Sequence, residues 1–161
     1  MAPLTSIGEL DRIVAAARGT GRRIVFTNGC FDVLHRGHVE YLEEASRLGD
    51  LLIVGLNDDA SVARLKGPSR PVNSLEDRAA VLTALSSVDY VIEFKEDTPL
   101  ELIRRITPDV LVKGGDYRVE EIVGKELVEA SGGQVVVLKE VPGKSTTAIL
   151  RRLAGGNGDR S

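Results

Sequence analysis

Short stretches of consecutive apolar residues alternate along this chain with longer stretches in which apolar residues recur every three or four positions. The short stretches predict buried strands, because they lack the exposed polar face of a surface strand. We expect strands at about residues 23–27, 51–56, 89–94, 110–112 and 134–138. Strands that are apolar on both faces are typical of a parallel sheet covered by helices on either side.

The longer stretches predict helices, and several carry residues that mark helix ends. Ser6 and Glu9 have the spacing of a capping box, and Gly19 follows the last apolar position of that helix. Pro99 is expected at a first helical position, where its missing N–H is harmless. We expect helices at about residues 7–18, 37–48, 58–65, 74–85, 120–130 and 145–153, with a further one beginning at Pro99.

Five strands separated by helices predict an α/β fold with a doubly wound, mostly parallel, five-stranded Rossmann-like sheet. We expect a single domain over residues 1–154 and a disordered tail over residues 155–161. Ligands of such sheets bind beyond the carboxyl ends of the strands. Each candidate functional segment follows a predicted strand, so the sequence predicts one ligand site at that edge of the sheet.

The composition narrows the possible functions. With 161 residues, of which 42% are hydrophobic, the chain can bury one full core. A net charge of -3 and an aromatic content of 4% argue against a nucleic-acid partner. The single cysteine excludes an internal disulfide, and no apolar run approaches the ~20 residues of a membrane span. We therefore expect a cytoplasmic protein without a targeting segment or a membrane partner.

The only two histidines, His35 and His38, lie three positions apart, shortly after the first predicted strand. Asn28 and Gly29 form the turn that leaves the strand, and Gly37 lies between the histidines at the start of a predicted helix. The unpaired N–H groups of a helix start bind anions. Two imidazoles beside them are typical of a site that holds a triphosphate and stabilises the charge that develops during nucleotidyl transfer.

A histidine pair with this spacing could instead be half of a metal site, completed by Cys30 and a nearby acid. No second cysteine and no histidine–glutamate metal motif accompanies the pair. The glycines and the preceding strand also lie where phosphate binding requires them. The phosphate interpretation is therefore favoured, and we assign no metal ligand.

Two further segments leave alternatives open. The run from Lys113 through Gly114 to Asp116 is either a plain glycine turn or a place where the backbone approaches a nucleotide closely. The hydroxyl residues at 145–147 either cap a helix or also bind phosphate, and these roles are compatible.

Three basic residues and the cysteine have plain structural explanations on local grounds. Lys66 and Arg70, in an irregular segment, would ordinarily be solvated surface charges. Arg78 falls off the apolar stripe of its predicted helix, so a surface position is expected for it. Cys30 is expected to be a small packing residue, because no neighbour could serve as the base that a thiol nucleophile needs.

The histidine run resembles the signature of the cytidylyltransferase-like branch of the nucleotidyltransferase superfamily. The matching residues are Gly29, Phe31, Asp32, Leu34, His35, Gly37 and His38. Within that branch, further segments are similar to the adenylyltransferases that act on heptose 1-phosphate. These segments are 57–61, 64–67, 70–73, Arg78, 96–99, 108–109, 113–117 and 145–147, and the resemblance covers about residues 22–150. In many bacteria this domain is fused to a kinase, for which 161 residues leave no room, so a stand-alone form is expected.

The resemblance implies transfer of AMP from ATP to D-glycero-D-manno-heptose 1-phosphate, giving ADP-heptose and pyrophosphate for lipopolysaccharide or capsule synthesis. It implies that Mg²⁺ accompanies ATP and that the protein is a homodimer. The implied catalytic residues are His35, His38, Lys66 and Arg78. The implied nucleotide-binding residues are Asn28, Gly29, Cys30, Phe31, Gly37, Lys113, Gly114, Asp116, Ser145, Thr146 and Thr147. Asp32 and Asn57 are expected to contact the sugar.

Two alternatives remain open at this point. The first is a glycerol-3-phosphate cytidylyltransferase, although Val141 and Pro142 stand where that group carries an Arg-Thr pair. The second is a nucleotide-binding module without catalytic activity, against which the intact histidines argue.

Overall fold

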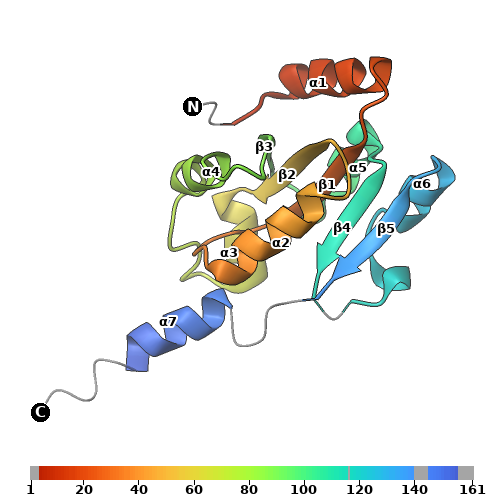
Figure 1. Ribbon diagram of the computed structural model, residues 1–161. Coiled ribbons are helices and arrows are strands. Elements are labelled where there is room, and N and C mark those ends of the chain that lie inside the picture. Colours follow the sequence, from red (N-terminus) through yellow and green to blue (C-terminus); the bar gives the residue numbers. More distant parts are fainter. Residues whose placement is uncertain (1–3, 116, 140–144, 156–161) are drawn as a thin grey trace, which may run out of the picture.

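The computed structural model describes residues 4–115, 117–139 and 145–155. Its elements, in chain order, are α1 (Ile7–Gly19), β1 (Ile24–Gly29), α2 (Arg36–Ser46), β2 (Leu51–Asn57), α3 (Asp59–Lys66), α4 (Leu75–Thr83), β3 (Tyr90–Phe94), α5 (Leu100–Ile106), β4 (Val110–Gly114), η1 (Val119–Glu121), α6 (Lys125–Ala130), β5 (Gln134–Leu138) and α7 (Thr146–Gly155). The predicted fold class is confirmed, because helices flank a five-stranded sheet in which every strand pair is parallel (Figure 1).

The strand order β3-β2-β1-β4-β5 places the reversal of winding between β1 and β4. The chain moves outward from β1 to β2 and β3, and then returns to the other side of β1 for β4 and β5. The ends of β1 and β4 part at such a reversal, which opens a crevice above their carboxyl ends. The fold therefore predicts the position of a ligand site before any side chain is considered.

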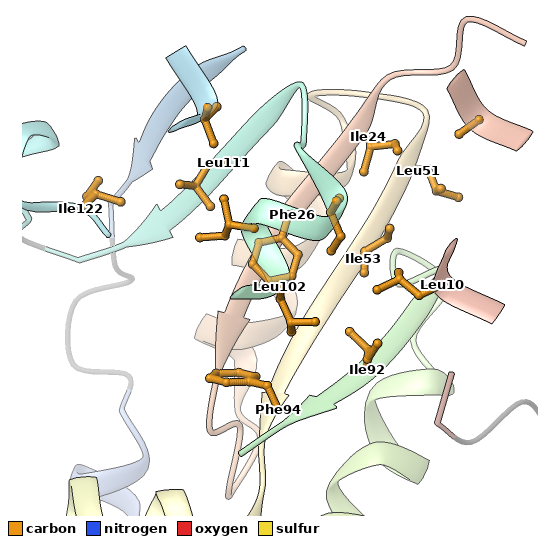
Figure 2. Packing of buried hydrophobic residues seen from close by; sticks show 14 residues of the cluster. Leu10, Ile24, Phe26, Leu51, Ile53, Ile92, Phe94, Leu102, Leu111 and Ile122 are labelled. Atoms are coloured by element: carbon orange, nitrogen blue, oxygen red, sulfur yellow. The ribbon is translucent and has the colours of Figure 1, made fainter. Parts of the chain in front are cut away.

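The core has one apolar layer on each face of the sheet, because successive side chains of a strand point to opposite faces. Ile24 and Phe26 of β1 pack in the layer that also contains Leu102 of α5, whereas Val25 packs in the layer that contains Leu42 of α2. Figure 2 shows the first layer, with Phe26 among side chains from both halves of the sheet. Both faces of β1 and β2 are buried, which explains their uninterrupted apolar sequences.

Several predicted boundaries differ from the structure for identifiable reasons. The expected helix at 120–130 is confirmed only from Lys125 onward, as α6, and a short 3-10 helix, η1, precedes it. Gly124 separates the two with a φ of +90°, and a Cβ there would lie 2.7 Å from Ile103 Cδ1. Pro99 is the N-cap of α5 and not its first residue. Gly155, expected in the tail, ends α7, and residues 156–161 lie outside the described part.

None of the helices in the described part of the chain is long and apolar enough to cross a membrane.

Asp109 connects three strands at the edge of the sheet that lies opposite the ligand site. Its Oδ2 accepts hydrogen bonds from the Ile24 N–H at 2.7 Å and from Arg18 Nη1 at 2.6 Å. Its backbone oxygen accepts from the Gln134 N–H, so the starts of β1, β4 and β5 meet at this residue. Burial alone would raise the pKa of the Asp109 carboxyl, but the hydrogen bonds from Ile24 and Arg18 outweigh it and lower that pKa.

We predict that Asp109→Ala lowers the free energy of unfolding by about 2 kcal/mol at pH 7, because the buried Ile24 N–H loses its acceptor. Since the native pKa lies below the unfolded value of about 4, the carboxylate stabilises the fold above that pH. Its contribution is lost as the pH falls through the native pKa. Urea denaturation measures both effects. The matched control Asp11→Ala removes an exposed ion pair with Arg105 and should change stability by less than about 0.5 kcal/mol.

Candidate active site

The loop between β1 and α2 carries both histidines and is anchored by a buried aromatic residue. Phe31 is 7% exposed and has a φ of 45°, in the left-handed region that non-glycine residues rarely occupy. Its ring packs into the core layer beneath α2 and also contacts the His38 ring, with the ring centroids 5.3 Å apart. Core packing thus holds the loop in a conformation that the backbone would not choose by itself.

The two histidines cap the start of α2. His35 is the N-cap, and its Nδ1 accepts a hydrogen bond from the Gly37 N–H at 3.0 Å. His38 Nδ1 accepts from the His35 N–H at 3.4 Å, and the two rings stack with their centroids 3.9 Å apart. A nitrogen that accepts carries no proton, so the proton of each neutral ring lies on Nε2. The hydrogen-bond network therefore makes both Nε2 atoms donors.

Burial and, to a smaller extent, the neighbouring His35 ring together lower the pKa of His38 to about 4. An ordinary histidine is half protonated near pH 6.5. His38 is therefore neutral at physiological pH and offers an N–H donor without a formal charge.

A cavity of about 650 Å³ opens at the carboxyl edge of the sheet, where the winding reverses. Its lining contains most of the residues predicted from the sequence, drawn from the ends of β1, β2 and β4, from the start of α2 and from the start of α7. These residues are Asn28, Gly29, Cys30, Phe31, Asp32, His35, Gly37, His38, Asn57, Lys66, Lys113, Gly114, Ser145, Thr146 and Thr147. Arg78 is not among them, and Asp116 lies outside the described residues.

Three cationic and three acidic side chains line the cavity within the described part of the chain. Lys66, Arg70 and Lys113 all line it, which gives an anionic ligand cations on more than one side. Burial lowers the pKa of Lys113, whose ammonium lies 5.0 Å from the centroid of the Tyr117 ring. The sequence had left Arg70 as a solvated surface charge, whereas its side chain is 13% exposed and paired with Asp32. This expectation for Arg70 was wrong because the sequence does not reveal the buried acid.

Gly114 lies in close contact with Tyr41. A Cβ at Gly114 would be 2.9 Å from Tyr41 Cε2, so no larger residue fits without displacing the ring. The Tyr41 hydroxyl lies 2.6 Å from Thr27 Oγ1, and burial raises the pKa of Tyr41 to about 12. Tyr41 itself lines the cavity. It lies one helical turn after His38, and that spacing could have identified it from the sequence.

Asp32 and Asn57 are engaged within the protein. The Asp32 carboxylate accepts from Arg70 Nε at 2.7 Å and from the backbone N–H groups of Val72 and Asn73. Burial would raise the pKa of Asp32, but these hydrogen bonds keep it below its ordinary value. Asn57 Nδ2 donates to Ser61 Oγ at 3.2 Å. Both residues line the cavity, and their contact with a sugar stays a prediction.

Arg78 is buried, with an exposed fraction of 2%, so the surface position expected from its helix stripe is wrong. Its guanidinium donates to three backbone carbonyls and to the Asp59 carboxylate. Helical periodicity could not predict this position, because three of the four acceptors come from segments distant in the sequence.

The start of α7 is capped as the sequence predicts. Ser145 Oγ accepts from the Ala148 N–H at 3.0 Å, and Thr146 Oγ1 donates to the Val33 carbonyl at 2.9 Å. The second bond ties α7 to the histidine loop. The neighbouring segment 140–144, with Val141 and Pro142, lies outside the described residues. Within the described ranges, no group of three or more histidine, cysteine or acidic side chains could hold a metal ion.

Comparison with known proteins identifies relatives along most of the chain. The cytidylyltransferase-like family matches residues 26–152. The chain is 59% identical over 145 residues to the bifunctional protein HldE of Syntrophotalea carbinolica. It is 60% identical over 145 residues to the bifunctional protein HldE of Pseudomonas aeruginosa strain LESB58. These alignments cover 90% of this chain but only 30% and 31% of the relatives, so the chain spans under a third of their length.

A solved structure has a similar fold. The lipopolysaccharide core biosynthesis protein from Thermoplasma volcanium superposes with a TM-score of 0.61 at 29% sequence identity. The superposition covers 75% of this chain and 98% of that protein.

We predict that the His38 ring stays neutral, with its proton on Nε2, from pH 8 down to pH 5.5 (roughly one unit below an ordinary histidine). NMR of the ring nitrogens during a pH titration measures both the pKa and the tautomer, and the variant His38→Gln assigns the signals. A pKa at or above 6.5, or a proton on Nδ1, would contradict this arrangement.

Proposed function

Because the chain belongs to the cytidylyltransferase-like family, we propose that it transfers AMP from ATP to D-glycero-D-manno-heptose 1-phosphate. The products are ADP-heptose and pyrophosphate, for the synthesis of lipopolysaccharide or capsule sugars. One observation carries the proposal: His35 and His38 present Nε2–H donors at the start of α2, in a cavity lined by Lys66 and Lys113. The HldE relatives and the lipopolysaccharide core biosynthesis protein support the sugar assignment.

The reaction requires no general base from the protein. The nucleophile is an oxygen of the sugar phosphate, whose second pKa of about 6 leaves it largely ionised at neutral pH. This oxygen attacks the α-phosphorus of ATP, and the bond from that phosphorus to the oxygen bridging to the β-phosphate breaks. The electron pair leaves with pyrophosphate. The protein has to align the two phosphates and stabilise the leaving group, which is a matter of position and charge.

The residues of the cavity suit these tasks. The two imidazole Nε2–H groups at the start of α2 are donors for phosphate oxygens, and such donors contribute most where charge develops. Lys66 from the end of α3 and Arg70 from the segment after it line the same cavity as Lys113 from β4. We assign Lys66 to the triphosphate, residues 145–147 to its β- and γ-phosphates, and Lys113 with Gly114 to the nucleoside.

We propose that Mg²⁺ enters with ATP. Two of the three carboxylates among the described cavity residues are already engaged within the protein, which suits a loosely held ion and not a dedicated protein site. Asp32 is buried and saturated by donors, and Asp97 pairs with Arg64 at 2.9 Å. Mg²⁺ keeps several waters and binds readily through phosphate oxygens. When bound, it would neutralise charge on the triphosphate, and no side chain of the described part is assigned as its ligand.

We predict that ATP with heptose 1-phosphate is turned over with a kcat/KM roughly 100-fold or more above that for CTP. A base site that pairs with adenine leaves polar groups unpaired against cytosine, and such mismatches have effects of this size. Pyrophosphate release measures the rates for both nucleotides with heptose 1-phosphate and with glycerol 3-phosphate, each with and without Mg²⁺.

The combinations of nucleotide, acceptor and Mg²⁺ in that assay distinguish between the alternatives. Preferred use of CTP with glycerol 3-phosphate would overturn the heptose assignment and keep nucleotidyl transfer. No pyrophosphate from any pair, with ATP binding retained, would identify a binding module. Full activity with EDTA and no added Mg²⁺ would exclude the proposed role of the ion.

We predict that His38→Ala lowers kcat at least ~100-fold and changes ATP affinity much less, because the ring donor acts mainly on charge that develops in the transition state. Steady-state rates and equilibrium binding measure the two effects. His38 also accepts a weak hydrogen bond from the His35 N–H, so the melting temperature has to be compared with that of the wild type. A kcat within a few-fold of the wild-type value would refute the proposed role of His38.

A further inference from the structure

Arg78 is buried between two segments that line the cavity. One carries His35 and His38, and the other carries Lys66 and Arg70. The Arg78 side chain has no exposed area. Nη1 donates to the carbonyls of Cys30 and Asn57, each at 2.8 Å, and Nε donates to the Asn73 carbonyl at 3.0 Å. Nη2 donates to Asp59 Oδ1 at 2.7 Å. A single planar group thus binds the histidine loop, the end of β2, the start of α3 and the loop before α4.

Asn73, which accepts a hydrogen bond from Arg78, is also bonded to Asp32 of the histidine loop. The Asn73 N–H donates to the Asp32 carboxylate at 2.9 Å, and Asn73 Nδ2 donates to the Asp32 carbonyl at 2.7 Å. The carboxylate also holds Arg70, which lines the cavity. The segment 67–74, which directly follows Lys66, is therefore attached to the histidine loop by the hydrogen bonds of two buried residues, Asp32 and Arg78.

This arrangement leaves Arg78 without a way to reach a ligand. Arg78 is not one of the residues that line the cavity, and its guanidinium is surrounded by the four acceptors that it already binds. Lysine could not replace it, because one ammonium cannot reach carbonyls on several sides as a rigid planar fork does. A residue whose role was only to place positive charge near a phosphate would not need acceptors on several sides.

We propose that Arg78 is a positioning residue that sets the spacing between the histidine loop and the Lys66–Arg70 loop and does not contact the nucleotide. The proposal rests on the proposed nucleotidyl transfer for its effect on rate. Its structural part concerns the free protein and is independent of which substrates are used.

The test compares Arg78→Lys with the matched surface variant Arg105→Lys. Arg105 pairs with Asp11 in an exposed ion pair on α1 and α5, away from the cavity residues. We expect Arg78→Lys to lower kcat at least ~10-fold with a smaller change in the KM for ATP. In the free protein, it should also shift the ring resonances of His35 and His38. Arg105→Lys should leave both the kinetics and the resonances at their wild-type values.

Unchanged histidine resonances together with weaker ATP binding would overturn the proposal in favour of direct contact. If Arg78→Lys fails to fold, Asn73→Ala tests the same connection from an exposed residue, since it removes only the bond to the Asp32 carbonyl. We expect roughly a fivefold loss of kcat and smaller histidine shifts, in keeping with one hydrogen bond. Wild-type values for this variant would equally overturn the proposal.

The two proposals fail separately. If the wild type releases no pyrophosphate from any substrate pair but Arg78→Lys shifts the histidine resonances, the proposed function fails and the positioning role stands. If the wild type is active and the resonances do not move, the positioning role fails and the function stands.

Discussion

The start of α2 has to satisfy its first N–H groups and still offer hydrogen-bond donors to an open cavity. A helix usually satisfies these groups with a serine or an aspartate, but an acidic cap would repel phosphate. Here the cap consists of two imidazoles whose Nδ1 atoms accept backbone N–H groups. The same bonds leave the opposite nitrogens as donors. Capping the helix and building the anion site are therefore one interaction, and the other features of the site depend on it.

A neutral His38 also limits repulsion from the cations of the cavity. Lys66, Arg70 and Lys113 line the same space, and an imidazolium ion at His38 would add like charge next to them. Burial lowers the pKa of His38 to about 4 and so avoids that cost. The cavity can then combine cationic side chains with an uncharged imidazole donor. Fixed donors need little reorganisation when negative charge develops.

The parts that could be predicted from the sequence are those set by local pattern. The strand at 134–138 and the capping box at Ser6 depend on neighbouring residues alone, and both occur as expected. The clustering of the histidines with Lys113 follows from the rule that parallel strands end at one edge. The break before α6 could not be predicted, because it depends on Gly124 packing against Ile103 from another element. The burial of Arg78 could not be predicted for the same reason, since three of its four acceptors lie in distant segments.

The contrast between Arg78 and Arg70 shows how the protein separates two uses of the same side chain. Both lie near the acid–amide pair of Asp32 and Asn73, and both are largely buried. Arg70 makes an ion pair with Asp32 through Nε and still lines the cavity. Arg78 instead donates to three backbone carbonyls and to the Asp59 carboxylate. A buried guanidinium with such partners costs too much to move, which makes it suited to fix a distance. A guanidinium at the wall can respond to a phosphate.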